Sequence, residues 1–249
     1  MKRLIVFDLD GTLARSKSPV DPGMSTLLTA LLGVTRAAII SGGAWPQFEA
    51  QLLRGLPRDE RLSRLSLLPT CGTKFFVYRG DWTELYSEDL GPGDRDTIVH
   101  ALARALKESG FAPTRVWGQA IEDRGSQITL SVLGQQAPLD AKIGWDPDFT
   151  RRKKIKAILD TLLPGFSVRL GGMTSIDVTR SGIDKGYGIG KLRDLLGIAL
   201  EEMVFVGDAL FVGGNDRPAM DAGVASIEVR DPEDTRRIIE TLVACLEPS

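Results

Sequence analysis

The chain has 249 residues, a formal net charge of -2 at pH 7 and a hydrophobic content of 43%, values typical of a globular protein. It lacks the basic excess of nucleic-acid-binding proteins, and no apolar run reaches the ~20 residues needed to cross a bilayer. Two cysteines, Cys71 and Cys245, are too few for a disulfide framework. We therefore predict a cytoplasmic monomer or homodimer that binds neither nucleic acid nor membranes. The length of the chain suits two domains.

The first part of the chain alternates strands with helices. Residues 4–7 form a short, continuously apolar run, which is typical of a parallel strand buried on both faces. The elements expected after it are a helix that begins at Pro22 with Asp21 as its N-cap, a strand at 37–40, a helix over roughly 45–54, a short strand near 66–69 and a hairpin that turns at 79–81.

The pattern then changes to one with more local pairing. Two amphipathic helices end at Gly110 and before Pro164, and polar and apolar residues alternate over 128–132, 166–170 and 175–179. Alternation indicates antiparallel strands with one polar face, a candidate substrate surface. Buried strands at 203–206 and 224–229 then resume the first pattern. We predict an α/β fold: a Rossmann-like, doubly wound parallel core (residues 1–80 and 183–249) with an inserted α+β cap domain (residues 81–182).

Polar side chains follow several of the predicted core strands. They are Asp8, Asp10 and Thr12 after the first strand, Ser41 with Gly42 after the second, Lys185 at the start of a helix, and Asp208, Asn215 and Asp216 after "MVFVGD". In an open α/β sheet, residues at the carboxyl ends of the strands meet in one crevice. Several carboxylates there would repel one another unless a cation lay among them, and Mg²⁺ prefers such oxygen ligands.

This set of residue types suits phosphoryl transfer. An ionised aspartate facing a phosphate can take the phosphoryl group as an aspartyl-phosphate. A second carboxylate two residues further on can protonate the leaving group and later deprotonate the acceptor. Ser41 and Lys185 would hold the phosphoryl oxygens.

The motifs "DLDGTL", a serine after the second strand, "DKG" before a helix and "GDALFVGGND", in this order, resemble those of the haloacid dehalogenase superfamily. The resemblance implies that Asp8 is the nucleophile and Asp10 the general acid/base, whose backbone carbonyl also binds Mg²⁺. It further implies that Asp208 is a metal ligand, that Asn215 and Asp216 support the metal site, and that Thr12, Ser41, Gly42 and Lys185 contact the phosphate.

Within the superfamily, the chain is most similar to the eukaryotic-type phosphomannomutases. The support is "GGMTSIDV" followed by "GIDKGYG", and "IEDRGSQITLSVLGQQ" before the basic segment "RRKKIKAIL". The resemblance implies that Arg124, Ser175 and Asp177 contact a sugar phosphate from the cap. Where the mutases carry two further arginines, this chain has Gln135 and Trp117.

We therefore predict a Mg²⁺-dependent phosphohydrolase that acts on a phosphorylated sugar or similar small metabolite. A mutase must hold a second phosphate in the cap, whereas a hydrolase needs only the phosphate at Asp8. A phosphomannomutase that interconverts mannose 1-phosphate and mannose 6-phosphate is the alternative. A non-catalytic sugar-phosphate sensor is disfavoured because both aspartates of the first motif are present.

Overall fold

The computed structural model describes residues 2–246 of the chain. The chain forms two compact units, one from Met1–Ser87 with Ile183–Ser249 and one from Glu88–Gly182. The first unit extends past the predicted boundary at residue 80. The reason is that strand β5 (Trp82–Ser87) pairs with β4 (Lys74–Tyr78) and so completes the sheet of the first unit.

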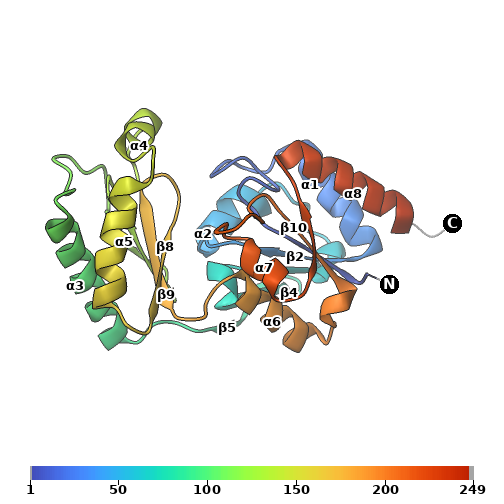
Figure 1. The fold of residues 1–249 in the computed structure, drawn as a ribbon. Helices are drawn as coiled ribbons and strands as arrows, with labels where there is room; N and C mark the ends of the chain where they lie inside the picture. The colour runs from blue at the N-terminus through green and yellow to red at the C-terminus, as the bar shows by residue number, and fades with distance from the viewer. Residues whose placement is uncertain (1, 247–249) are drawn as a thin grey trace. The chain divides into compact units, whose positions relative to one another are not determined.

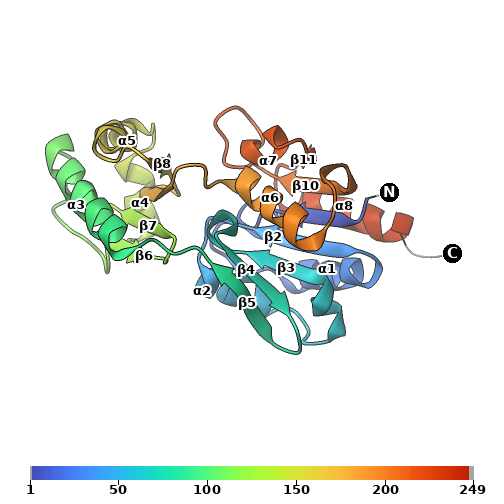
Figure 2. The same cartoon turned by 90° about the horizontal axis from the view of Figure 1, so that it is seen from below.

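The first unit contains a seven-stranded sheet in the order β11-β10-β1-β2-β3-β4-β5. Its five strands from β11 to β3 are parallel, and β4 and β5 add an antiparallel edge (Figures 1 and 2). The other strands are β1 (Leu4–Phe7), β2 (Arg36–Ile40), β3 (Leu65–Leu68), β10 (Met203–Gly207) and β11 (Ala225–Glu228).

Helices cover both faces of this sheet. The helices are α1 (Pro22–Val34), α2 (Trp45–Phe48), α6 (Lys185–Leu196), α7 (Arg217–Asp221) and α8 (Pro232–Leu246), with a π-helix η1 (Glu49–Leu53) and the 3-10 turns η2 (Glu60–Arg64), η3 (Thr70–Gly72) and η4 (Leu200–Glu202). Leu28 of α1 and Ile239 of α8 are buried in one apolar cluster with Phe7. Ile189 of α6 and Ala219 of α7 belong to the cluster on the other face. The doubly wound α/β core is confirmed.

Two elements of the first unit differ from their predictions. The helix expected over 45–54 is one turn of α-helix followed by the π-helix, which begins at Glu49. The strand expected at 224–229 is buried only at its flanks, Val224 and Val229, because β11 is an edge strand whose Ala225 and Ile227 are exposed.

The second unit is a four-stranded antiparallel sheet in the order β6-β7-β9-β8. The strands are β6 (Ile121–Asp123), β7 (Gln127–Ser131), β8 (Phe166–Leu170) and β9 (Ser175–Arg180), and the helices are α3 (Pro92–Ser109), α4 (Leu139–Trp145) and α5 (Thr150–Leu162). Leu102 of α3 and Ile155 of α5 pack on Leu130 and Ile176 of the sheet. The alternate residues Thr129 and Ser131 therefore lie on the other face.

Among the described residues, no helix combines the length and the apolar composition that a membrane span requires.

Candidate active site

The carboxyl ends of the neighbouring strands β10, β1 and β2 bring the polar residues of three motifs together. Phe7 at the end of β1 is in register with Val206 of β10 and with Ile39 of β2. The next residue, Asp8, is tied to β10 by a backbone hydrogen bond from its N–H to the Val206 carbonyl (3.0 Å). Parallel pairing therefore places Asp8 beside Asp208 on one side and Ser41 on the other.

Lys185 links Asp8 to Asp216. Its Nζ donates to Asp8 Oδ1 at 2.5 Å and also to Asp216 Oδ1. All three side chains are at least 96% buried. Lys185 is the first residue of α6, where the helix dipole disfavours a cation, and the two carboxylates compensate for it. Asp184 holds this helix start in place, because its Oδ1 accepts the Tyr187 N–H at 3.0 Å.

The two ion pairs set the charge states of the group. Burial by itself lowers the pKa of Lys185, but the charges of Asp8 and Asp216 outweigh burial, so the pKa is raised and the ammonium stays charged. Burial raises the pKa of Asp8 to about 7; Lys185 opposes this shift, and the negative charge of Asp216 adds to it. Burial, followed by Asp216, also raises the pKa of Asp208.

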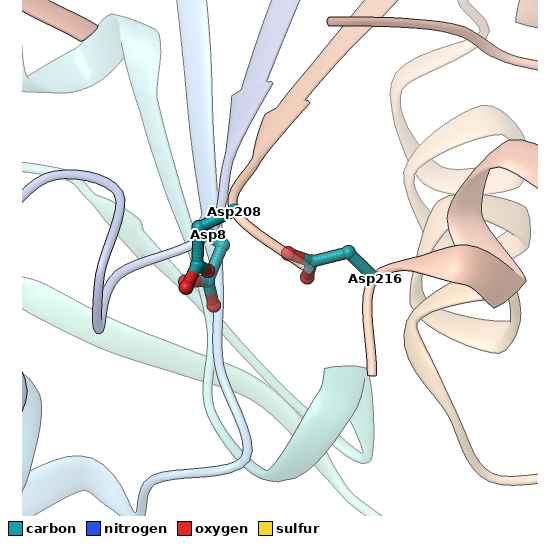
Figure 3. A group of neighbouring side chains, drawn as sticks. All are labelled: Asp8, Asp208 and Asp216. Carbon is teal, nitrogen blue, oxygen red and sulfur yellow. The ribbon is translucent and has the colours of Figure 1, made fainter. Parts of the chain in front are cut away.

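Asp8, Asp208 and Asp216 form a cluster that fits a divalent cation. Each offers a carboxylate oxygen, and these three atoms lie within 4.8 Å of one another (Figure 3). The buried Oδ2 of Asp8 has no hydrogen-bond partner. Three carboxylates facing one lysine leave excess negative charge, and an unpartnered buried carboxylate oxygen is costly unless a cation or donor satisfies it. Asp216 Oδ2, in contrast, already accepts the Ala209 N–H at 2.9 Å.

Gly11 is required for the cluster to form. Its φ is +94°, a conformation that other residues rarely adopt, and a Cβ built there would overlap the carboxylate of Asp208. Thr12, the next residue, is fully buried, and its Oγ1 donates to Asp208 Oδ1 at 3.4 Å.

Ser41 occupies the corresponding position after β2. It is buried, and its Oγ accepts the Gly43 N–H at 3.1 Å, so the loop of residues 41–43 turns back over the hydroxyl. Gly42 has open space where a Cβ would be.

Asp10 is half-buried, and its carboxylate contacts groups outside the acidic cluster. It accepts hydrogen bonds from the Lys17 N–H, from Gln47 and from Gln51. The two glutamines did not emerge from the sequence. They lie four residues apart, a spacing that places two side chains on the same face of a helix, and they follow soon after "ISGG". That spacing is the signal that could have identified them.

Asn215 also lies apart from the network of Asp8, Lys185, Asp208 and Asp216. It is exposed and makes no side-chain hydrogen bond with a described residue. Its neighbour Asp216, the N-cap of α7, is buried and pairs with Lys185.

The predicted cap residues lie on the second unit, where each has a partner within that unit. Arg124 donates to Glu122 Oε2 at 2.8 Å, and Gln135 donates to the same oxygen at 2.8 Å. Thr129 donates to Asp177 Oδ1 at 2.7 Å, and the hydroxyls of Ser131 and Ser175 are 3.1 Å apart. Glu122 is thus a shared acceptor that the sequence did not single out.

Comparisons with known proteins agree with this fold and site. The profile of the eukaryotic phosphomannomutase family matches residues 95–245. A probable phosphomannomutase of Caenorhabditis elegans is 24% identical over 99% of this chain and 97% of its own length. Phosphomannomutase 1 of Homo sapiens is 26% identical over 93% of this chain and 88% of its own length. A haloacid dehalogenase-like hydrolase from Bacteroides thetaiotaomicron superposes with a TM-score of 0.64 at 16% identity, over 97% of this chain and all of its own.

A doubly wound core with paired aspartates after β1, a buried lysine and an acidic cluster defines a haloacid dehalogenase-type enzyme of phosphoryl transfer. Enzymes of this type generally use a divalent metal. Within that class, the chain belongs to the eukaryotic phosphomannomutase family.

Proposed function

We propose that the protein is a Mg²⁺-dependent phosphohydrolase that removes the phosphoryl group from a phosphorylated sugar or similar small metabolite. The observation that carries the proposal is the buried Asp8 beside Lys185, with one carboxylate oxygen held by the lysine and the other without a partner. The positive charge of Lys185 favours the ionised carboxylate, which is the nucleophilic form.

The reaction proceeds in two steps on the side chains of the first motif. A carboxylate oxygen of Asp8 bonds to phosphorus while the bond from phosphorus to the ester oxygen breaks, and Asp10 gives a proton to that leaving oxygen. Water then transfers a proton to Asp10 and attacks the phosphorus, which releases phosphate and restores Asp8. The proton on Asp10 is thereby ready for the next cycle.

Lys185 and Ser41 neutralise and orient the phosphoryl oxygens. Lys185 carries a permanent charge because Asp8 and Asp216 raise its pKa. Asp8 and Asp208 would hold Mg²⁺ with the backbone carbonyl of Asp10, and Asp216 would position Lys185. When bound, the cation stabilises the charge that develops on the phosphoryl group.

The charges of the second unit favour hydrolysis over mutase activity. A mutase must bind a second phosphate, yet the Arg124 guanidinium is paired with Glu122, and Gln135 is neutral. Lys142, another cation of the second unit, donates to the Gln135 carbonyl at 3.2 Å. One arginine neutralised by a carboxylate is a weak site for a dianionic phosphate.

Phosphomannomutase activity is the second candidate, and membership of the eukaryotic phosphomannomutase family favours it. The two activities differ in whether water or a sugar hydroxyl accepts the phosphoryl group from Asp8. Relatives that are phosphomannomutases by name match nearly the whole chain, including the region of Arg124, Ser175 and Asp177.

The test is to incubate the protein with Mg²⁺ and mannose 1-phosphate, with and without a hexose bisphosphate. We expect release of inorganic phosphate that Asp8→Asn abolishes. Formation of mannose 6-phosphate faster than release of phosphate would replace the hydrolase by the mutase. Binding of sugar phosphates without turnover, and unchanged in Asp8→Asn, would indicate a sensor. A broader panel of phosphorylated metabolites then identifies the substrate.

A further inference from the structure

The carboxylate of Asp10 is held differently at its two oxygens. Oδ1 accepts two hydrogen bonds, from the Lys17 backbone N–H at 2.6 Å and from Gln51 Nε2 at 3.1 Å. Oδ2 accepts one, from Gln47 Nε2 at 2.7 Å. Because an ionised carboxylate can only accept, both amides must turn their nitrogen toward it. Two oxygens of one carboxylate thus have unequal environments.

The Oδ1 side is anchored by rigid structure. Gln51 is 95% buried in the π-helix η1, and its Nε2 also donates to the Ser18 carbonyl at 2.9 Å. Lys17 has a φ of 56°, a left-handed conformation that is uncommon for a residue other than glycine, and this conformation accompanies its N–H contact with Asp10. We conclude that Oδ1 has a fixed position, whereas Oδ2 depends on the half-buried Gln47.

Gln47 also contacts the loop that follows β2. A Cβ built on Gly43 would overlap the amide group of Gln47, so this amide lies directly against the Gly43 backbone. The Gly43 N–H in turn donates to Ser41 Oγ at 3.1 Å. One glutamine amide therefore lies between the carboxylate of Asp10 and the loop of the candidate phosphate-binding serine.

We propose that Gln47 is a positioning residue for Asp10, whose Oδ2 it holds in place. This inference rests on the proposed function, in which Asp10 gives a proton to the leaving oxygen and regains it from water. An amide suits the position because its N–H group donates to the carboxylate of Asp10 and fixes the direction of Oδ2. Gln47 thus orients Oδ2, while Gln51 and Lys17 hold Oδ1.

The first experiment compares leaving groups. In Gln47→Leu, we expect kcat/KM on an alkyl or sugar phosphate to fall about 10-fold, part of the ~10²–10⁴-fold that general acid catalysis supplies. For p-nitrophenyl phosphate, whose leaving oxygen needs no proton, we expect a change of less than about 2-fold. A purely structural role for Gln47 would lower both values equally, and that result would overturn the inference.

Three further variants check the assignment. Gly43→Ala displaces the Gln47 amide without removing it, so we expect the same selective loss on the alkyl phosphate. Glu49→Leu, at an exposed position of the adjoining π-helix, is the matched control and should leave both rates unchanged. In an Asp10→Asn background, Gln47→Leu should cause no further loss, because a positioning residue acts only through its partner. Additive losses would contradict the inference.

A measurement without turnover separates this inference from the proposed function. With ¹³C-labelled aspartate, the side-chain resonance of Asp10 is the one that disappears in Asp10→Asn. At pH 8 it should shift in Gln47→Leu and Gly43→Ala but not in Glu49→Leu. An unchanged resonance would overturn the role of Gln47 even in an active enzyme. A shifted resonance in a protein that releases no phosphate would instead count against the proposed function.

Discussion

Asp8 and Asp10 are two residues apart, yet their surroundings suit different tasks. Asp8 is buried, paired with Lys185 and close to two further carboxylates. Asp10 is half-buried and surrounded by N–H donors from Lys17, Gln47 and Gln51. Leu9, which lies between the two aspartates in the sequence, is fully buried. The two carboxylates on either side of it lie in different environments.

This division predicts unequal variants. Asp8→Asn should abolish turnover of every substrate, because no other residue accepts the phosphoryl group. Asp10→Asn should lower kcat/KM on sugar phosphates about 10²–10⁴-fold but preserve a burst of p-nitrophenol from p-nitrophenyl phosphate. Rapid-quench kinetics measures the burst. Equal and total loss in both variants on the aryl substrate would contradict the division of roles.

Among individual residues, the sequence predicted the charged side chains of the site but missed the two glutamines that contact Asp10. Asp8, Lys185 and Asp208 stand out because charges after buried strands need an explanation. Gln47 and Gln51 do not, because a polar residue on a helix is ordinarily solvated. Their role depends on which way the helix turns after Ala44, and the onset of a π-helix at Glu49 changes that direction in a way that periodicity does not reveal.

Among the elements, α1 and α8 show how a helix cap also connects two helices. Asp21 caps α1 by accepting the Gly23 and Met24 N–H groups at 2.9 and 3.1 Å, and it also pairs with Arg236 of α8. The hydrogen bond from Arg236, followed by that from Met24, holds the pKa of Asp21 below its usual value of 3.8. The ionised form of Asp21 is therefore the form that stabilises the folded protein.

Asp21→Ala should lower the free energy of unfolding by about 1 kcal/mol at pH 7, the usual cost of losing a helix cap. Because the folded-state pKa is depressed, this contribution is present above pH 3.8 and is lost as the pH falls through the folded-state value. Thermal unfolding of both proteins at pH 7 and pH 3.5 measures the difference. Asp96→Ala, at an exposed position of α3, is the control. A difference that grows at low pH would contradict this linkage.

Turn and sheet-edge residues mark the limits of element prediction. The hairpin of β4 and β5 was expected from its Gly80 turn, but its assignment to the first unit follows from the pairing of β4 with β3, a strand outside the hairpin. The alternating strands β7 and β9 were also expected. Their polar face was predicted as an open surface, whereas Thr129 and Ser131 are buried and bonded to Asp177 and Ser175. Hydrogen bonds between side chains on paired strands depend on register, which hydrophobic periodicity does not specify.

At the scale of the whole molecule, cation binding and stability should be linked through Asp8. Its pKa of about 7, raised by burial, means that the metal-free folded protein holds a proton there that the unfolded chain releases near pH 3.8. The contribution of this Asp8 proton to the stability of the folded protein is complete below pH 3.8 and is lost as the pH rises through 7. A bound divalent cation requires the ionised form of Asp8, so the stabilisation by the cation increases as the pH rises.

We therefore expect Mg²⁺ to raise the melting temperature more at pH 8 than at pH 6. A concentration of 100 times Kd corresponds to about 2.7 kcal/mol of stabilisation. Differential scanning calorimetry with Mg²⁺ or with EDTA measures the effect. Asp208→Asn, which removes one carboxylate of the cluster, should abolish the response. An equal Mg²⁺ response in wild type and Asp208→Asn would place the cation elsewhere.

The first unit is built from two segments of chain, and this has a consequence for biosynthesis. Strand β1 lies between β2 from the first segment and β10 from the second, so the central pairing of the sheet joins residues about 200 positions apart. During synthesis at the ribosome, β1 cannot pair with β10 until the segment of residues 88–182 has been translated, which takes on the order of 5 to 20 s at ordinary elongation rates. The second unit, whose strands come from one continuous stretch, can fold during that wait. Asp8 and Ser41 leave the ribosome early, but they acquire Lys185 and Asp208 only when residues 185–208 emerge, so the nascent chain has no assembled active site before then.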